Sequence, residues 1–495
     1  MKKPWHTLLM LAAVMLVLGL VSAVIPEQGW QISQNITINF PTLQDILRPE
    51  KTEYSDISKI VEQNQDTSLK LAPEIKQQGF DTTRVDADSL RQLTTELEMT
   101  EAGQQKLYDF FSKIMNAKSS GEQIRIWHYG DSQIESGRIS GFLRERLQQS
   151  FGGNGPGLLP MKPVTQKLSW QVEASGDWQR HTLFGRRDTT IPHNRFGPLM
   201  SVFRFSPWPN DSMTETSSNQ TSYRATSTIK NSFQGYAHAQ KYQNAWLYYG
   251  NQQHPFFLNI LDDNDESVFQ DSIFPSGKLF NVFQIPVQEN TKAFSLEVSG
   301  KNSPDFYGIS LESANGVIVD NMPMRGSSGL IFTRSDASFY KQQLDYFGVD
   351  LILMQFGVNV VSKEKERDYD YYERWIYSQL QAIKRLSPKT PVIVIGISDM
   401  SEKDGTTYKT YNNVIHVRNA LKNATQRAGY CFWDLFEAMG GENAMPSWVF
   451  AEPPLANTDF THFNYRGARI ISNMFYNALM YEYQKFLTGF AETNE

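Results

Sequence analysis

The stretch from Ile124 to Leu147 constrains the fold more than any other part of the chain, because it predicts a buried strand, a tight turn and a helix in direct succession. Residues 124–129 are mostly apolar or aromatic, as in a strand buried within a sheet. Gly130-Asp131-Ser132 falls on the turn that follows. Apolar residues then recur at the spacing of an amphipathic helix, at Ile139, Phe142, Leu143 and Leu147. A strand followed by a helix is the building unit of α/β folds, so we predict this fold class.

Ser132 occupies a position on this turn that suits a nucleophile. Open α/β sheets bind ligands at the carboxyl ends of their strands, and N–H groups at a helix start favour developing negative charge. The alternative is that Asp131 or Ser132 only caps the helix, which is a common role for both residue types. The turn alone does not separate the two interpretations.

Strand-like and helical segments alternate again from residue 306 to the end of the chain. The strand-like segments are 316–320, 350–356, 391–397 and 431–435, and the helical ones are 338–347, 370–386, 411–428 and 466–487. Leu, Phe and Ile at helical spacing over 89–115 predict one or two helices before the first strand. Strands joined by helices of this length form a parallel sheet with helices on both faces.

Residues 161–305 are predicted to form a β-sandwich inserted into this α/β domain, which then comprises 106–160 and 306–495. Short alternating segments in the insert are separated by turn clusters of Asn, Asp, Gly and Ser. Four tryptophans are candidate sugar-stacking platforms or, as the more common alternative, core residues: Trp170, Trp178, Trp208 and Trp246. The Gly-rich run 152–157 follows a helix and lacks the Lys-Ser or Lys-Thr ending of a phosphate loop, so we predict a plain loop.

Residues 1–25 predict a membrane segment. Lys2 and Lys3 precede an apolar run of 18 residues, Leu8 to Ile25, which is about the minimum for a membrane span. Cleavage after Ala23 would give a secreted protein, but the apolar run continues past that site and favours a signal anchor. Both outcomes place the remainder outside the cytoplasm. Residues 26–105 are predicted to be a polar tether with a leading helix.

Composition excludes two classes of protein. The chain has 495 residues, a formal net charge of -6 and a pI near 5.9, so it lacks the basic surplus of a nucleic-acid-binding protein. Its single cysteine, Cys431, excludes an internal disulfide, and no Cys/His spacing indicates a zinc site. Cys431 lies in an apolar run and is predicted to be buried. We expect no metal.

Three further motifs fall where predicted elements end. Gly326 lies in a Gly- and Ser-rich loop beyond one strand, and Asn359 directly follows another. Asp459 and His462 form an Asp-Phe-Thr-His run before the last helix. Each motif alone fits a turn or a cap.

Together with Ser132 these residues supply what acyl transfer needs. A serine hydroxyl becomes a good nucleophile when a neutral imidazole accepts its proton, and a carboxylate fixes the tautomer of that imidazole. Asp459 and His462 are three residues apart, so one turn of chain can bring their side chains together. The tetrahedral oxyanion needs donors fixed in advance, and the Asn359 amide at a strand end can be one of them.

The four blocks in this order resemble the SGNH (GDSL-type) hydrolase family, over about 120–160 and 306–490. The resemblance implies a three-layer, flavodoxin-like fold in which Ser132 is the nucleophile, His462 the general base and Asp459 the carboxylate that orients His462. It also implies an oxyanion hole made by the N–H groups of Ser132 and Gly326 and the side-chain amide of Asn359.

Three residues near these blocks offer an alternative or depart from the family pattern. Gly329 is a second glycine in the Gly326 loop, and Gly326 is preferred for its distance from the strand. His128 is a rival for the general base, although a packed histidine is favoured because strand geometry holds it below the turn. Gln133 stands where family members usually have Leu or a similar apolar residue, a departure from lipase-like specificity that leaves the mechanism unchanged.

An export segment and a β insert after the first block most resemble the peptidoglycan O-acetylesterases, whose insert is similar to a carbohydrate-binding module. This implies a serine esterase that removes O-acetyl groups from a cell-envelope polysaccharide, peptidoglycan in the first place, through an acyl-serine and without a cofactor. Its partners would be that glycan and, through residues 8–25, the membrane, at the periplasmic face. Two alternatives are an O-acetyltransferase that uses the same serine and a non-catalytic polysaccharide-binding protein. Retention of all five site residues argues against the second.

Overall fold

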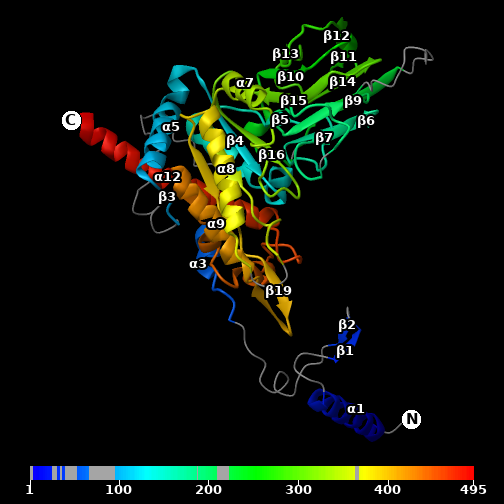
Figure 1. The fold of residues 1–495 in the computed structure, drawn as a ribbon, viewed down its shortest axis with the longest axis vertical. Coiled ribbons are helices and arrows are strands. Elements are labelled where there is room, and N and C mark those ends of the chain that lie inside the picture. Colours follow the sequence, from blue (N-terminus) through cyan, green and yellow to red (C-terminus); the bar gives the residue numbers. More distant parts are fainter. Residues whose placement is uncertain are drawn as a thin grey trace.

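The computed structural model describes residues 4–24, 30–33, 36–38, 53–65, 95–186, 188–208, 222–232, 234–362 and 367–494. Within them, a central sheet of six strands forms the α/β part (Figure 1). In spatial order its strands are β16 Gly316–Pro323, β4 Gln123–Gly130, β17 Val349–Gln355, β18 Val392–Ile395, β21 Cys431–Trp433 and β3 Glu98–Met99. The first five are parallel and β3 is antiparallel, so the predicted parallel sheet is confirmed.

The order of the parallel strands places β4 at a switch point. Counted along the chain, the five strands lie in the flavodoxin-like order 2-1-3-4-5. In such sheets the chain leaves the first strand in one direction and later returns on its other side, which opens a crevice at the carboxyl end of that strand. The turn with Ser132 follows β4 and therefore lies at this crevice.

Alternate residues of the parallel strands bury opposite faces of the sheet. On β4, Ile124 and Ile126 pack with a layer of three helices, α5 Glu101–Ser120, α6 Ser140–Phe151 and α12 Tyr465–Asn494. Trp127 and Tyr129 pack in the opposite layer, which contains α7 Ala337–Phe347, α8 Asp370–Leu386 and α9 Asn413–Ala428. The predicted helices on both faces are present.

Local signals explain where two of these helices begin and end. Thr100 accepts a hydrogen bond from the N–H of Gly103 at the start of α5, and Gly121 ends that helix at a φ of 70°. Asp336 caps α7 by accepting from the N–H of Phe339, and Gly348 ends it at a φ of 58°. These caps satisfy groups that the helix backbone leaves without partners.

Two antiparallel sheets lie between α6 and β16. The first contains β7 Gln179–Thr182, β8 Ser201–Arg204, β15 Asp305–Glu312, β10 Asn244–Gly250 and β13 Asn281–Gln284, with β5 Gly157–Leu159 paired to β15. The second contains β6 Trp170–Gly176, β9 Tyr223–Asn231, β14 Ala293–Gly300, β11 Phe256–Leu261 and β12 Ser267–Ile273. Their inner faces meet, with the rings of Phe256 and Phe306 5.5 Å apart. Because β5 precedes residue 161 and all of β15 except Asp305 follows residue 305, the first sheet extends past both ends of the predicted insert, whose boundaries stay a prediction.

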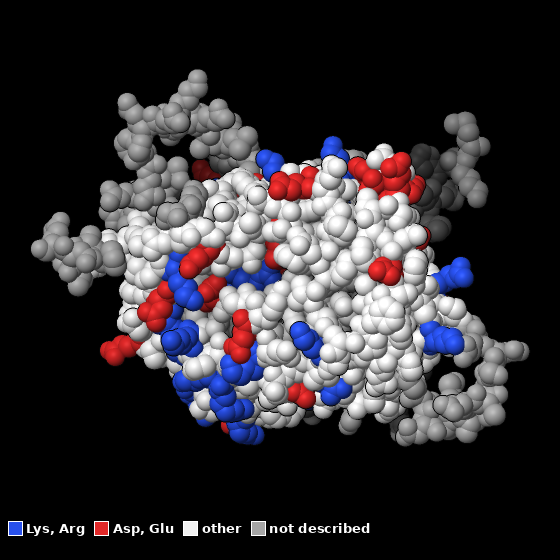
Figure 2. Space-filling model, turned by 90° about the horizontal axis from the view of Figure 1, so that it is seen from above, with Lys and Arg blue, Asp and Glu red and all other residues white. Residues whose placement is uncertain are grey.

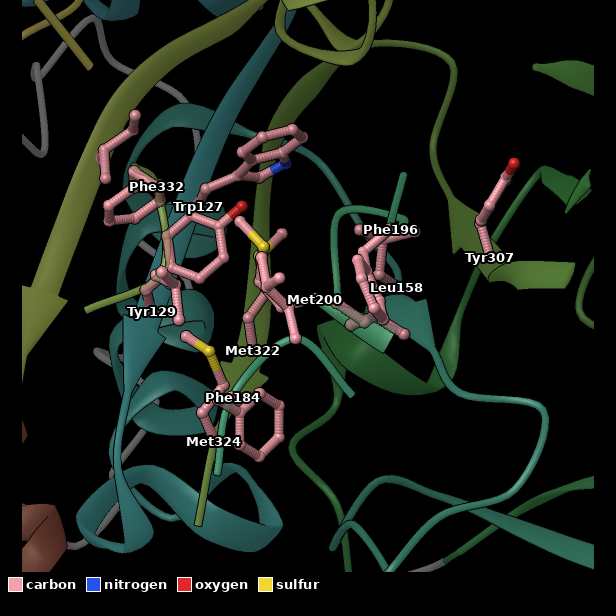
Figure 3. Packing of buried hydrophobic residues seen from close by; sticks show 14 of the residues in the cluster. Trp127, Tyr129, Leu158, Phe184, Phe196, Met200, Tyr307, Met322, Met324 and Phe332 are labelled. Carbon is pink, nitrogen blue, oxygen red and sulfur yellow. The ribbon is translucent and has the colours of Figure 1, made fainter. Parts of the chain in front are cut away.

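The antiparallel sheets share one hydrophobic core with the parallel sheet. Figure 3 shows Trp127 and Tyr129 of β4 and Met322 of β16 beside Phe184 and Met200 of the antiparallel part. All five side chains are buried. An apolar seam of this kind holds the two parts together through packing rather than through a flexible linker.

The structure differs from the expectations in detail. The helix after β4 begins only at Ser140, and Ser132 instead opens a 3-10 helix, η1 Ser132–Gly137. Trp170 and Trp178 are core residues, 1% and 2% exposed. Within the predicted helical span 89–115, Glu98 and Met99 instead form strand β3, and the helix begins only at Glu101. Elements that were not predicted are β1 Trp30–Ser33, the hairpin β19 Ser401–Asp404 and β20 Thr407–Thr410, α3 Ser58–Gln65, η2 His238–Gln240, α10 Leu435–Ala438 and α11 Ala444–Phe450.

The N-terminal helix α1 spans Pro4–Val24. It is long and apolar enough to cross a membrane, judged by length and composition alone. A two-stranded hairpin follows, in which β1 pairs with β2 Ile36–Ile38. Most of the predicted tether, and the start of the helical pattern at Leu90 and Leu93, lies outside the described residues. On the face shown in Figure 2, acidic and basic side chains are interspersed and a broad area carries neither.

Candidate active site

Close contacts fix the turn that carries Ser132. The N–H of Asp131 donates to the carbonyl of Gln355 on the neighbouring strand at 3.1 Å, and the N–H of Met324 donates to the carbonyl of Gly130 at 2.7 Å. A Cβ on Gly130 would lie only 2.9 Å from Gln355 O and from Ile134 Cδ1, so only glycine fits there without a shift. The turn is thus bonded to both of the strands beside β4.

Ser132, His462 and Asp459 form a continuous hydrogen-bonded chain. Ser132 Oγ lies 2.7 Å from His462 Nε2, although the two residues are 330 positions apart. His462 Nδ1 lies 2.8 Å from Asp459 Oδ2. Ser132 is buried, whereas the His462 side chain is 25% exposed, so the imidazole faces both the serine and the solvent. This order of hydroxyl, imidazole and carboxylate is the arrangement that activates a serine.

The Asp459 carboxylate is held in its ionised form. Its burial would raise the pKa, but hydrogen bonds from the His462 side chain and from the N–H groups of His462 and Thr461 outweigh burial and lower the pKa to about 2. Both N–H groups donate to Oδ1 at 3.0 Å. The other oxygen, Oδ2, is therefore free to accept from the imidazole, which fixes the tautomer with an unprotonated Nε2 toward Ser132.

The predicted oxyanion donors lie on the neighbouring strand ends. Gly326 follows β16 in a tight turn closed by the N–H of Ser327 donating to the carbonyl of Met324 at 2.9 Å, and its φ of 78° favours glycine. Its own N–H has no hydrogen-bond partner among the described residues. Asn359 follows β17 and donates one N–H of Nδ2 to the carbonyl of Ser327 at 3.1 Å. The second N–H of that amide is left for a ligand.

Gly329, the alternative glycine, already uses its N–H in a hydrogen bond within the loop. Its N–H donates to Ser327 Oγ at 3.1 Å, and a Cβ there would lie 2.9 Å from the ring of Phe356. The hydroxyl of Tyr372 on α8 donates to the carbonyl of Ser328 at 2.9 Å and holds the same loop. The geometry therefore favours Gly326 over Gly329 as the donor.

His128, the rival for the general base, does not face Ser132. Its Nδ1 lies 2.9 Å from Ser140 Oγ, and the side chain is completely buried beneath the turn. Burial, with the nearby Arg144 cation, lowers the pKa of His128 to about 3. It is a packed histidine, as favoured from the sequence.

Two positioning residues were not predicted. Gln133 Nε2 donates to the carbonyl of Thr461 at 2.7 Å, and Gln133 Oε1 accepts from the N–H of Phe463 at 3.4 Å. The Arg138 guanidinium donates to the carbonyl of Ser132 at 2.9 Å and to that of Phe463 at 2.8 Å. The residues on both sides of His462 are thus tied to the serine turn. The only sequence signal was the polar residue at 133, where the family has an apolar one.

Comparison with known proteins gives structural matches only. No protein-family profile and no curated protein matches the chain. A solved structure of a peptidoglycan O-acetylesterase aligns over 78% of this chain and 99% of its own length, at 20% identity and a TM-score of 0.58. Two further structures match smaller parts of the chain. An acetyl xylan esterase aligns over 33% of this chain and 81% of its own length, at 14% identity and a TM-score of 0.26. A structure described as a GDSL-like lipase from Parabacteroides merdae aligns over 33% of this chain and 73% of its own length, at 15% identity and a TM-score of 0.24. The first likeness establishes the fold, so the chain has the three-layer architecture with added β sheets that the SGNH-type resemblance implied.

Proposed function

We propose that the protein is a serine esterase that removes O-acetyl groups from a cell-envelope polysaccharide, with peptidoglycan as the leading candidate. The observation that carries the proposal is the chain of contacts from Ser132 Oγ to His462 Nε2 at 2.7 Å and from His462 Nδ1 to Asp459 at 2.8 Å. The fold shared with a peptidoglycan O-acetylesterase supports the choice of substrate.

In the proposed reaction Ser132 Oγ attacks the carbonyl carbon of the acetyl ester while His462 Nε2 takes the hydroxyl proton. The N–H groups of Ser132 and Gly326 and the Asn359 amide stabilise the oxyanion. The intermediate collapses, the sugar oxygen leaves with the proton from His462, and the acetyl group remains on Ser132. Water then attacks the acetyl carbon while His462 takes its proton. The bond between that carbon and Ser132 Oγ breaks, and His462 returns the proton to Oγ as acetate leaves.

Hydrolysis of p-nitrophenyl acetate by the full-length protein tests the nucleophile. Ser132→Ala should lower kcat by a factor on the order of 10⁴ or more, because the whole acyl-transfer step depends on that hydroxyl. Ser378→Ala is the matched control, since this serine is exposed on α8 and its hydroxyl only bonds Arg374 O. Equal rates for wild type and Ser132→Ala would remove the assignment.

Product analysis on O-acetylated peptidoglycan then separates hydrolysis from transfer. An esterase should release acetate whether or not a sugar acceptor is added, whereas a transferase should yield acetylated acceptor. We further propose that α1 anchors the protein at the periplasmic face, because Lys2 and Lys3 precede it. Deleting residues 1–25 should then move the protein from the membrane fraction to the soluble one.

A further inference from the structure

A small cavity lies at the seam between the α/β part and the antiparallel sheets. Its volume is about 60 Å³, measured as the space open to the centres of water-sized groups, which is room for several such groups. The α/β part contributes Glu135, from the 3-10 helix that Ser132 opens, and Arg325, which directly precedes Gly326. The antiparallel part contributes Lys167 and Arg180. The cavity therefore lies beside the candidate active site without including Ser132.

The charged groups that face the cavity leave one cation without a partner. Glu135 pairs with Arg325 at 3.0 Å, and Lys167 Nζ donates to the carbonyl of Leu158 at 2.6 Å. A fifth group, Lys162, donates to the carbonyl of Trp178 at 2.6 Å. The guanidinium of Arg180 has no hydrogen bond or ion pair to any described residue. It only stacks over the ring of Phe184, at 5.6 Å.

This balance of charges favours an anion. Glu135 is paired with Arg325, so Lys162 and Arg180 give the cavity a positive surplus. Burial lowers the pKa of Arg180, against the attraction of the nearby Glu135 carboxylate, and burial lowers the pKa of Lys167 to about 7, so Lys167 is partly neutral near pH 7. A carboxylate would satisfy the planar fork of a guanidinium with two parallel hydrogen bonds.

The remaining walls suit a short carbon chain. They are formed mostly by apolar side chains, among them Leu159, Val172, Leu199 and Phe203. A carboxylate carried on a one- or two-carbon arm would place its oxygens at Arg180 and its carbons against these walls. Phosphate or sulfate esters are larger and gain less from an apolar wall.

We propose that this cavity is a subsite for a carboxylate side group of the glycan substrate, and that Arg180 is the residue that recognises it. The inference rests on the proposed esterase function. Glu135 is three residues from Ser132, which limits the separation of their Cα atoms to about 11 Å. A sugar whose acetyl ester lies at Ser132 could therefore present a carboxylate to the cavity, either as the free lactyl carboxylate of a peptidoglycan sugar or as the carboxylate of a uronic acid.

Binding to the full-length Ser132→Ala protein tests the subsite independently of catalysis. The probes are an O-acetylated disaccharide with a free lactyl carboxylate, an O-acetylated diuronate, and the methyl ester of each. At least one free acid should bind about 10- to 100-fold more tightly than its methyl ester, and the acid that does so identifies the source of the carboxylate. Equal affinity of both acids and their esters would overturn the proposal.

The variant R180Q assigns the effect to Arg180. In the Ser132→Ala background R180Q should reduce the acid-to-ester affinity ratio to about one, and R180K should leave an intermediate ratio. R224Q, an exposed arginine on the second antiparallel sheet, should keep the full ratio. A melting curve shows whether R180Q folds. If it folds, an undiminished acid-to-ester ratio in R180Q contradicts the assignment. If it does not fold, an undiminished ratio in R180K contradicts it. If binding depends on the carboxylate but the wild type hydrolyses no ester, the proposed esterase function is wrong and the proposed subsite still stands.

Discussion

The side-chain amide of Gln133 donates to the backbone carbonyl of Thr461 at 2.7 Å and thereby ties the turn that carries Ser132 to the loop that carries His462. Gln133 Nε2 also lies 3.1 Å from Ser398 Oγ, so the amide is held from a third segment. The Arg138 guanidinium makes a second tie between the two loops, at 2.9 Å to Ser132 O and 2.8 Å to Phe463 O. The position of the imidazole relative to the serine hydroxyl therefore depends on tertiary hydrogen bonds.

Replacing Gln133 by leucine should lower kcat for p-nitrophenyl acetate about 10- to 100-fold with little change in KM. The leucine fills similar space but cannot hold the His462 loop, and misplacing a reacting group by about 1 Å costs a factor of this size. Gln171→Leu, a half-buried glutamine on β6, is the matched control and should keep the wild-type kcat. An unchanged kcat in Gln133→Leu would show that the loop is positioned without this contact.

Asn359 offers a test of the oxyanion hole. Asn359→Ala should lower kcat about 100- to 1,000-fold and leave KM nearly unchanged, because the lost donor acts on charge that develops only in the transition state. Asn423→Ala, at an exposed position on α9, controls for the loss of a surface amide. A proportional rise in KM with constant kcat would instead place Asn359 in ground-state binding.

The sequence predicted the parts of the site that depend on local order along the chain. Ser132, Asn359 and the Asp459–His462 pair each follow or precede a strand or helix with a clear periodic pattern, so the edge of the sheet on which they meet follows from parallel topology. Gln133 and Arg138 could not be assigned this way. Their roles exist only through contacts with residues 461 and 463, more than 320 positions away.

One segment of the fold could not be predicted because its structure depends on tertiary contacts. The 3-10 helix after β4 has no periodic apolar signal, because Gln133 and Glu135 are buried polar residues held by hydrogen bonds and an ion pair. In this segment tertiary burial, not local pattern, decides the structure.

His128 should make the folded protein sensitive to acid. Burial lowers the pKa of His128 to about 3, whereas an unfolded chain binds the proton near pH 6.5. Below pH 6.5 the unfolded state therefore binds a proton that the folded state does not bind. The free energy of unfolding then falls by at most about 5 kcal/mol as the pH drops from 6.5 to about 3. In urea unfolding, His128→Gln should gain about 2–3 kcal/mol relative to wild type between pH 7.5 and 4.5.

The control for that experiment is His254→Gln, because His254 is exposed on the antiparallel part. Its difference from wild type should stay constant over the same pH range. A parallel pH dependence of wild type and His128→Gln would mean that the pKa of His128 is the same in the folded and unfolded states. Esterase activity should persist in His128→Gln, since the imidazole bonded to Ser132 is that of His462.

Gly130 and Gly141 should respond in opposite directions to the same substitution. At Gly130 a Cβ would meet Gln355 O and Ile134 Cδ1 at 2.9 Å, so Gly130→Ala must displace the serine turn and should cost about 1–3 kcal/mol of unfolding free energy, with a fall in kcat. At Gly141, inside α6, the nearest atom is a ring carbon of Tyr236 at 3.5 Å, an ordinary contact. Gly141→Ala should therefore raise the unfolding free energy, by at most about 0.5–1 kcal/mol because Gly141 is the second residue of α6 and alanine favours the helix. Urea unfolding of both variants measures the difference, and a Gly130→Ala protein as stable and active as wild type would contradict the close packing beneath Ser132.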